Sequence, residues 1–306
     1  MQKKINKTAI VGMGALGLLY GQKIAEVMGK DSVSFILDDD RFEAYKNRVF
    51  TCNGKQLDLK MQRSSVKETF DLVIVAVKYN GLSSALETMK NCVGENTIII
   101  SVMNGISSEK IIGKRYGMDK LLMTVAQGMD AMRDGSNLVY TKYGLLFIGN
   151  PDEAKSDENL LAVKDFFDKV EMPYKIEENI MYRMWAKWML NVGINQTCAV
   201  FDTTYEKATT PGKIMDIFVN AMKEVVELSK HEGINLKDTE VQTYIDIIKT
   251  LAPDGFPSMA QDRKACRLSE VEMFAGTVIE LAEKYKMDVP VNKFLYDEMK
   301  KIEADY

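Results

Sequence analysis

A short apolar strand, a glycine-rich turn and a helix follow one another at the start of the sequence. Residues 8–11 read T-A-I-V, the next six read G-M-G-A-L-G, and Ala15–Met28 has helical character. In such a unit Gly12 makes the tight turn, Gly14 lets the backbone approach a pyrophosphate, and Gly17 allows close packing of helix on sheet. The helix N-terminus adds free amides and the positive end of the helix dipole. We therefore expect a dinucleotide to bind at Gly12, Gly14, Ala15, Leu16 and Gly17.

The second strand, Val33–Leu37, ends in a run of acids, Asp38, Asp39 and Asp40, followed by Arg41. An acid at this place normally accepts from the adenosine ribose 2′-OH and indicates NAD, whereas a 2′-phosphate needs a base nearby. We therefore expect Asp38 to contact the ribose, with Arg41 as a partner for a 2′-phosphate if it turns inward. For Asp39 and Asp40 a solvated helix-capping run fits at least as well.

Strands and helices continue to alternate in the first half of the chain. An Asn53-Gly54 pair between alternating segments predicts a hairpin. The aliphatic run 72–77 is typical of a parallel strand buried on both faces. Later elements are expected at 82–92 (helix), 97–102 (strand), 121–126 (strand), 145–148 (strand), 159–169 (helix) and Tyr174–Ile176 (strand). Lys78 and Asn104 fall at strand ends, where open α/β sheets bind ligands, although each also fits a solvated lysine or a simple turn pair.

The pattern changes near Glu178, after which no strand is expected. Helical stretches are expected at 180–200, Lys213–His231, 239–251, 263–285 and 293–302, separated by T-T-P-G, P-D-G-F-P and D-V-P. The sequence thus predicts a Rossmann-type, doubly wound α/β domain over residues 1–178, which binds the dinucleotide, and an all-α domain over residues 179–306, which holds substrate and catalytic groups.

A stripe of polar side chains lies on the first helix of the second half. Lys187, Asn191 and Asn195 recur every fourth residue and so stack on one face, drifting by roughly 40° per step. The surrounding residues, among them Trp185 and Trp188, are apolar, as in a buried helix. A buried ammonium and two buried carboxamides require partners. Protein, water and a bound polar molecule all remain open as those partners.

Composition excludes several other functions. Apolar residues make up 46% of the 306 residues and charged residues 27%, as in a soluble globular protein. The net charge of −4 and the lack of a basic stripe exclude a dedicated nucleic-acid binder. The longest apolar runs are strand-sized, too short for a membrane span, and no secretory leader is expected. Four scattered cysteines without metal spacing predict a reduced, cytoplasmic protein with no metal site.

The single histidine, His231, stands near the end of a helical run, where a helix-dipole role is expected. Ser-His-Asp hydrolysis, histidine-based zinc sites and dehydrogenases with a histidine acid all need a better placed imidazole. Acid–base chemistry in this chain must therefore use lysine, tyrosine or a carboxylate.

Several motifs in this order resemble the ketopantoate reductases (2-dehydropantoate 2-reductases), and the resemblance covers essentially the whole chain. The first half carries G-M-G-A-L-G, K-Y-N and the N-G after I-I-I-S-V-M. The second half carries W-A-K-W-M-L-N-V-G-I-N, similar to W-x-K-x-x-x-N-x-x-x-N, then S-M-A-Q-D-R-K-A-C-R-L-S-E-V, similar to S-M-x-Q-D…E, and V-P-V-N, similar to P-x-N.

The resemblance implies reduction of ketopantoate to pantoate with NADPH, on the route to pantothenate and coenzyme A. It implies that Lys187 is the general acid and that Glu270 holds the substrate hydroxyl and orients the lysine. The remaining implied roles are substrate binding by Asn104, Asn191, Asn195 and Ser258, and a place at the cofactor edge for Lys78 and Asn104. A fixed ammonium stabilises the negative charge that hydride addition develops on the ketone oxygen, then donates its proton.

Two positions depart from the family pattern. Asp38 stands where the family usually has a base for the 2′-phosphate, so NADP(H), implied by the resemblance, competes with NAD(H), indicated by the acid. Ser107 replaces the second glycine often found after Asn104-Gly105. Burial beside the tryptophans would lower the pKa of Lys187 and Glu270 would raise it, and the sequence leaves the balance open.

The alternatives are a β-hydroxyacid dehydrogenase, a reductase of another 2-oxo acid, and a non-catalytic dinucleotide-sensing protein. The S-M-A-Q-D segment and the stripe spacing favour the reductase over the first, and the presence of lysine, glutamate and serine opposes the last. Tyr116 and Lys120 formally give the Y-x-x-x-K of short-chain dehydrogenases, but Gly117 and Asp119 predict a turn there. The expected partner is a small 2-oxo acid, with no nucleic acid and no membrane, and a homodimer is left open.

Overall fold

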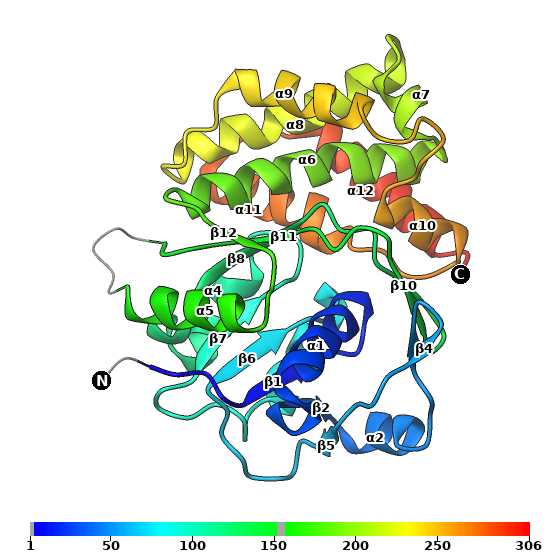
Figure 1. The fold of residues 1–306 in the computed structure, drawn as a ribbon. Helices are drawn as coiled ribbons and strands as arrows, with labels where there is room; N and C mark the ends of the chain where they lie inside the picture. The colour runs from blue at the N-terminus through cyan, green and yellow to red at the C-terminus, as the bar shows by residue number, and fades with distance from the viewer. Residues whose placement is uncertain (1–2, 152–156) are drawn as a thin grey trace. The chain divides into compact units, whose positions relative to one another are not determined.

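The computed structural model describes residues 3–151 and 157–306 (Figure 1). The chain divides into two compact units. The first comprises Met1–Asn104 and Ser108–Ile180, and the second comprises Gly105–Ser107 and Met181–Tyr306. Three residues from the first half of the sequence thus belong to the second unit.

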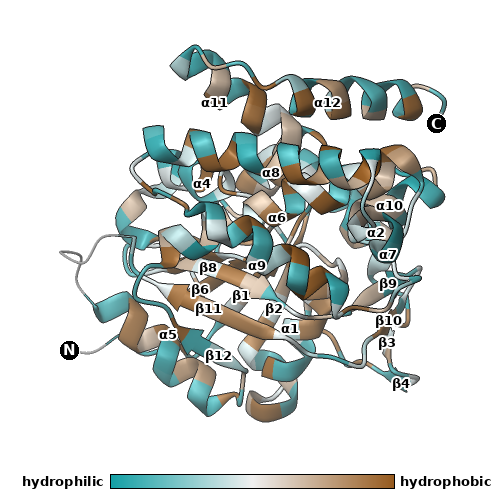
Figure 2. Ribbon diagram, turned by 90° about the horizontal axis from the view of Figure 1, so that it is seen from above, coloured by the Kyte–Doolittle hydropathy of each residue, from teal (hydrophilic) through white to brown (hydrophobic). Residues whose placement is uncertain are grey.

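The first unit is built on a five-stranded parallel sheet with the strand order β5-β2-β1-β6-β7. Its strands are β1 (Thr8–Val11), β2 (Val33–Leu37), β5 (Met61–Arg63), β6 (Leu72–Val75) and β7 (Ile98–Ser101). Every residue of β1, β2, β6 and β7 is buried, as expected of strands covered on both faces. Most of their residues are apolar, and brown shades predominate where these strands are visible in Figure 2. The predicted doubly wound α/β domain is confirmed.

The register of this sheet aligns the carboxyl ends of three strands. Val11 at the end of β1 pairs with Val75 of β6, and Val75 pairs with Ser101 of β7. The ladder continues one step further, since Ala76 N donates to Val11 O at 2.8 Å. The chain adds β2 and β5 on one side of β1 and β6 and β7 on the other. The segments that follow β1 and β6 therefore flank the topological switch point, where such sheets bind ligands.

Helices and two smaller sheets complete the first unit. The helices are α1 (Ala15–Met28), α2 (Asp39–Tyr45), α3 (Leu82–Thr88), α4 (Ser108–Tyr116) and α5 (Glu158–Lys169). A four-stranded sheet, β4-β3-β10-β9, contains β3 (Thr51–Cys52), β4 (Lys55–Gln56), β9 (Met132–Asp134) and β10 (Asn137–Val139). Asn53 and Gly54 both have positive φ between β3 and β4, which confirms the predicted hairpin.

The strand predicted at 121–126 is present as β8 (Met123–Gln127), and it belongs to a separate three-stranded sheet. It pairs antiparallel with β11 (Leu145–Gly149), which in turn pairs with β12 (Tyr174–Ile176), and only the bridge from Ile99 to Leu121 continues toward β7. An apolar run specifies a buried strand without specifying the direction of its neighbour.

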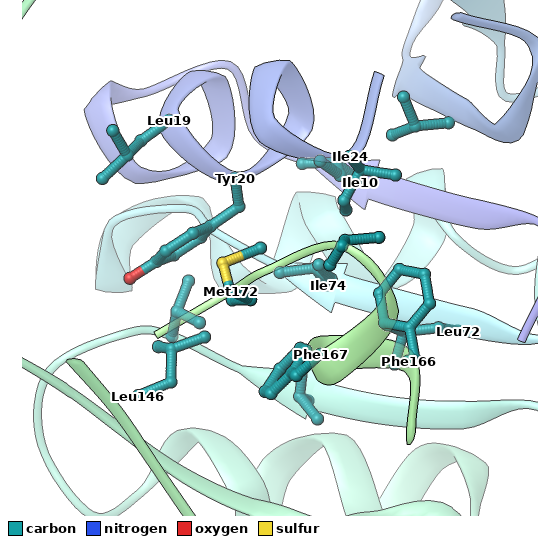
Figure 3. Close-up of a cluster of buried hydrophobic side chains, with 14 of the residues drawn as sticks. Ile10, Leu19, Tyr20, Ile24, Leu72, Ile74, Leu146, Phe166, Phe167 and Met172 are labelled. Atoms are coloured by element: carbon teal, nitrogen blue, oxygen red, sulfur yellow. The ribbon is translucent and has the colours of Figure 1, made fainter. Parts of the chain in front are cut away.

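The core of the first unit lies between the sheet and its helices (Figure 3). Ile10 and Ile74 from the central strands meet Tyr20 and Ile24 of α1, and Phe167 of α5 lies close by. The ring of Tyr20 is buried, and its hydroxyl has no hydrogen-bond partner in the described part of the chain. Tyr20 therefore contributes to the core through the apolar packing of its ring.

Helices are the regular secondary structure of the second unit in the described residues, and no strand is present among them, which confirms the all-α prediction. The helices are α6 (Ile180–Phe201), α7 (Tyr205–Thr209), α8 (Lys213–His231), α9 (Asp238–Lys249), α10 (Ser258–Lys264), the π-helix η4 (Glu272–Gly276), α11 (Thr277–Tyr285) and α12 (Pro290–Glu303). Within residues 3–151 and 157–306 no helix is long and apolar enough to cross a membrane. The same stretches contain no cluster of three or more His, Cys, Asp or Glu side chains suited to a metal ion.

The continuous helix predicted over residues 263–285 is wrong. Helix α10 ends at Lys264, Cys266 adopts a left-handed φ of +49°, and helical structure resumes only with the π-helix η4. Side-chain hydrogen bonds hold the chain in this conformation, and Asp262 Oδ1 accepts from Arg267 Nε at 2.9 Å across the break. Ser269 N also donates to the buried carboxylate of Glu303 at 2.7 Å. The periodicity of apolar residues in the sequence does not predict such contacts.

Candidate active site

In the glycine-rich turn after β1, close contacts within the protein require glycine at positions 12 and 17 but not at position 14. Gly12 has a φ of +114°, and a Cβ there would lie 2.4 Å from Ala76 O. A Cβ on Gly17 would lie 2.0 Å from Gly12 O. By contrast, the nearest atom to a Cβ on Gly14 would be Ala76 O at 3.7 Å. Space is therefore kept open at Gly14, where the fingerprint brings a pyrophosphate close to the backbone.

The N-terminus of α1 offers amides to that space. Gly14 is its N-cap, and in the described part of the chain no side chain caps this end and no acid stands in its first turn. Ala15 and Leu16 begin the helix and are only half-buried. Uncapped amides at the positive end of a helix dipole suit a phosphate group. The residues present therefore fit a dinucleotide.

Asp38 after β2 is the N-cap of α2. Its Oδ1 accepts from Arg41 N at 2.8 Å, and its Oδ2 lies 3.5 Å from Arg41 Nη1. The capping role expected for Asp39 and Asp40 thus belongs to Asp38, while Asp39 pairs with Arg63 at 2.7 Å. The Asp38 side chain remains 36% exposed. This carboxylate can still accept from a ribose hydroxyl, and Arg41 is held against it.

Arg133 lies against the glycine-rich turn and is absent from the sequence-based predictions. Its Nη1 donates to Met13 O, and its Nε donates to Gly135 O at 2.8 Å. The guanidinium carbon lies 5.5 Å from the ring centroid of Tyr45 and 5.3 Å from that of Phe50. A cation is thereby fixed beside the expected phosphate site. No local signal could reveal it, because R-D-G reads as an ordinary turn.

Lys78 and Asn104 are brought to the same edge of the sheet by the strand register. Lys78 is exposed and precedes the 3-10 helix η2 (Tyr79–Gly81), three residues beyond the end of β6. Asn104 is half-buried and lies three residues beyond the end of β7. Because Val75 and Ser101 pair at the ends of these strands, both segments leave the sheet beside the glycine-rich turn.

The amides on α6 form an oriented chain of hydrogen bonds. Asn195 Oδ1 accepts from Ser258 Oγ at 3.1 Å and from Met259 N at 3.2 Å. Because a backbone amide can only donate, this contact fixes the orientation of the Asn195 amide. Its Nδ2 then donates to Asn191 Oδ1 at 3.2 Å. Asn191 Nδ2 is left as a donor with no partner among the described residues.

Lys187 lies one helical turn before Asn191 on α6 and is half-buried. The indoles of Trp185 and Trp188 beside it are buried and meet edge to face, with centroids 5.2 Å apart. Glu270, also half-buried, stands two residues before the π-helix η4. The predicted substrate residues Asn191, Asn195 and Ser258 are thus joined by hydrogen bonds, and Lys187 and Glu270 belong to the same unit.

A cavity of about 440 Å³ in the first unit contains none of the predicted site residues. Phe42, Phe50 and Met61 are among its apolar lining residues. On its rim, Lys30 pairs with Asp58 at 2.9 Å and Lys60 pairs with Asp31 at 3.3 Å. Lys46 and Arg48 also line this cavity, but none of the lysine, amide or carboxylate groups of the predicted chemistry does.

The Tyr116/Lys120 pair is not a short-chain dehydrogenase site. Helix α4 ends at Tyr116, and Gly117 has a φ of +102°, as the sequence predicts for a turn. The Tyr116 hydroxyl donates to Leu86 O, and Lys120 Nζ donates to Glu95 O. The two side chains are therefore held by different backbone carbonyls.

The first unit has a parallel sheet and a helix N-terminus without a side-chain cap among the described residues. The second unit is helical and carries a lysine beside oriented amides. Together these features define the class of two-domain, dinucleotide-dependent oxidoreductases. Residues 8–153 match the model of the ketopantoate reductase family PanE/ApbA, and residues 179–303 match the C-terminal model of the same family. The chain belongs to the ketopantoate reductase family.

Relatives and solved structures extend this similarity over the chain. It is 25% identical to the 2-dehydropantoate 2-reductase of Pyrococcus horikoshii over 95% of each chain. It is 24% identical to that of Streptococcus pyogenes serotype M6 over 92% of each. A D-mandelate dehydrogenase solved with NADH and anilino(oxo)acetate has a TM-score of 0.84 at 21% identity, covering 98% of each chain. The dimeric ketopantoate reductase of Staphylococcus aureus has a TM-score of 0.79 at 20% identity, covering 98% of this chain and 99% of that one. At these identities the two structures show the shared fold alone.

Proposed function

We propose that the chain is a 2-dehydropantoate 2-reductase, which reduces the ketone of 2-dehydropantoate to the alcohol of pantoate. This reaction is a step toward pantothenate and coenzyme A. Dinucleotide binding is assigned to residues 1–178, and substrate binding and catalysis to residues 179–306. The observation that carries the proposal is the oriented amide chain from Ser258 through Asn195 to Asn191, which ends in a donor one turn from Lys187.

The nicotinamide dinucleotide supplies the hydride when bound. The first-turn amides of α1 bind its pyrophosphate, and Gly14 leaves room for that contact. Asp38 accepts from the adenosine ribose, and Lys78 and Asn104 lie at the cofactor edge.

Lys187 donates a proton to the ketone oxygen, and its charge stabilises the oxygen as negative charge develops there. Asn191, Asn195 and Ser258 hold the substrate carboxylate and hydroxyl, with Asn104 contributing from the loop after β7. A donor such as Asn191 Nδ2 suits a carboxylate or carbonyl oxygen, because both accept hydrogen bonds. Glu270 holds the substrate hydroxyl and orients the ammonium of Lys187.

A reductase of another 2-oxo acid that uses NADH is the second candidate. Asp38 favours it, since this capping carboxylate, with Arg41 held against it, opposes a 2′-phosphate. The D-mandelate dehydrogenase of similar fold was solved with NADH and anilino(oxo)acetate. The family relationship favours NADPH and 2-dehydropantoate.

The test is a two-by-two assay with NADPH and NADH against 2-dehydropantoate and small branched or aromatic 2-oxo acids, following loss of absorbance of the reduced nicotinamide. The proposal expects the highest kcat/KM with 2-dehydropantoate. Preference for another 2-oxo acid with NADH would select the second candidate, and inactivity with every combination would reject both. Asp38→Arg isolates the cofactor choice and should shift it toward NADPH.

A homodimer and a reducing, cytoplasmic location complete the proposal. The dimeric ketopantoate reductase of similar fold supports the first. The four unpaired cysteines, three of them buried, support the second. Light scattering of the purified protein would test the assembly state.

A further inference from the structure

The π-helix η4 begins two residues after Glu270 and is held by two side chains of α6. Trp188 Nε1 donates to Met273 O at 3.1 Å, and Gln196 Oε1 accepts from Ala275 N at 3.1 Å. Both side chains are completely buried. Each also directly follows a residue that the proposed function uses, since Trp188 follows Lys187 and Gln196 follows Asn195.

These bonds pair backbone groups of the π-turn, the Met273 carbonyl and the Ala275 amide, with side chains of α6. Glu270 O accepts from both Met273 N at 3.0 Å and Phe274 N at 3.1 Å, and Gly276 N spans five residues to reach Val271 O. The Ala275 amide within this wide turn is paired with Gln196. An unpaired amide buried there would destabilise the turn. Because π-turns in proteins are often found at functional sites, the position beside Glu270 is significant.

Gln196 is itself fixed from behind by a buried polar network. Its Nε2 donates to Val192 O at 2.7 Å and to Asn292 Oδ1 at 3.1 Å. Asn292 Nδ2 donates in turn to Glu224 Oε2 at 2.7 Å. Glu224 also accepts from the first-turn amides Val291 N and Asn292 N of α12. The network joins α6, η4, α8 and α12 and gives the Asn of the V-P-V-N motif a structural role.

The backbone on the other side of Glu270 is held as well. Ser269 N and Ser269 Oγ both donate to Glu303 Oε1, at 2.7 and 2.5 Å. Met273 packs against Gly105, where an added Cβ would lie 2.7 Å from Met273 Cγ. The segment that carries Glu270 therefore has fixed contacts both before and after this residue.

We propose that Trp188 and Gln196 are positioning residues that lock the π-turn onto α6 and so keep Glu270 in register with Lys187. This inference rests on the proposed function, which gives Lys187 and Glu270 their roles. Neither Trp188 nor Gln196 donates to or accepts from the substrate. They act through the backbone of η4, one on a carbonyl and the other on an amide, about two helical turns apart along α6.

The experiment compares Trp188→Phe and Gln196→Met with the control Thr197→Val. Thr197 is also buried on α6, but its hydroxyl has no partner among the described residues. For the two positioning variants we expect kcat for the preferred 2-oxo acid to fall about tenfold or more, because small misplacements of catalytic groups have large effects. The alkaline limb of the kcat/KM–pH profile should also move, since it reports the proton donor. Dinucleotide affinity, measured by fluorescence titration, should change less than about twofold, and the control should match wild type throughout.

Unchanged kcat and pH profile in folded Trp188→Phe or Gln196→Met would overturn the proposal. A fall in kcat without movement of the pH profile would also overturn it, because it would indicate a structural role only. If Gln196→Met fails to fold by circular dichroism, Trp188→Phe decides alone, since it keeps an aromatic ring and removes the indole donor. Failure of the proposed function is distinguishable, because wild type itself would then be inactive with every 2-oxo acid.

Discussion

Asn195 donates a hydrogen bond of 3.2 Å from Nδ2 to the Oδ1 of Asn191, one helical turn earlier on α6. Ser258 and Met259 N set the direction of this bond by donating to Asn195 Oδ1. The two carboxamides are therefore oriented before any ligand arrives, and the free end of the chain is a donor. Such preorganisation lowers the cost of binding an oxyanion or a carbonyl.

Loss of the Ser258 hydroxyl should weaken substrate binding modestly. In Ser258→Ala the Met259 amide still holds Asn195 Oδ1, so the loss is one hydrogen bond of about 1 kcal/mol, or about fivefold in KM. Asn195→Leu removes the whole relay and should lower kcat/KM by about 10²-fold. Steady-state kinetics with the 2-oxo acid measure both. Equal effects of the two changes would contradict the relay.

Lys187→Ala should reduce kcat by about 10²-fold or more, the scale of general-acid catalysis. Lys187→Arg should be impaired as well, because a guanidinium keeps the charge but does not release a proton near neutral pH. Dinucleotide affinity should remain close to wild type in both, which fluorescence titration would show. Turnover at the wild-type rate in Lys187→Ala would remove this lysine from the mechanism.

Arg133→Met should weaken dinucleotide binding by about tenfold or more, since a charged hydrogen-bonding group contributes roughly 1.5–3 kcal/mol. Arg48→Met is the matched control. The guanidinium carbon of Arg48 lies 5.2 Å from the ring centroid of Tyr45, as that of Arg133 does at 5.5 Å, but of these two arginines Arg133 is the one that donates to Met13 O. Titration of nicotinamide fluorescence measures both affinities. Similar affinities in the two variants would show that Arg133 has no special role at the turn.

Three of the four thiols should be inert in the folded protein. Burial raises the pKa of Cys92 and of Cys198 to about 12 and raises the pKa of Cys52, so the reactive thiolate is scarce at pH 8. Cys266 is exposed. An aromatic disulfide reagent at pH 8 should therefore release one equivalent rapidly from native protein and four after denaturation. Two or more rapid equivalents would contradict the buried environments.

Tyr20→Phe should leave the free energy of unfolding unchanged or raise it by about 1 kcal/mol, because the buried hydroxyl has no partner in the described chain. Tyr143→Phe is the matched control and should destabilise, since its hydroxyl contacts Leu19 O at 3.4 Å and Met172 Sδ at 3.1 Å. Denaturant titrations compare the two variants with wild type.

The same tyrosine affects alkaline stability. Burial raises the pKa of Tyr20 in the folded state, so ionisation favours the unfolded chain. Its contribution to stability is complete below its unfolded pKa of about 10 and is lost as the pH rises beyond that value. Tyr20→Phe should therefore lose less stability than wild type between about pH 10 and pH 11. Equal losses of stability in wild type and Tyr20→Phe over this pH range would contradict the buried environment of the Tyr20 hydroxyl.

The sequence predicted those parts of the fold in which local pattern and burial agree. The strands Thr8–Val11 and Val33–Leu37 and the helix Ala15–Met28 have the predicted bounds, because each is a buried strand or an amphipathic helix bounded by glycine or acids. The direction of β8 and the break between Lys264 and the π-helix were beyond prediction. Both depend on contacts between residues distant in sequence, such as Ser269 with Glu303.

The candidate site shows the same division. The glycine-rich turn and the stripe of Lys187, Asn191 and Asn195 are periodic and can be recognised in a single stretch. Arg133 reaches Met13 across 120 residues of sequence, and Gln196 looks like any polar residue in a helix until Ala275 is placed opposite it. Hydrogen bonds between residues this far apart in the chain cannot be recognised from the local sequence.

The membership of Gly105–Ser107 in the second unit has a consequence for synthesis of the chain on the ribosome. This loop leaves the ribosome with the first unit, but Met273 and Thr277, which it contacts, are made more than half a chain length later. The parallel sheet can form early around β1, whereas the loop after Asn104 must wait for the C-terminal helices. A chain truncated before Met273 would thus hold a finished sheet beside a loop that lacks these contacts.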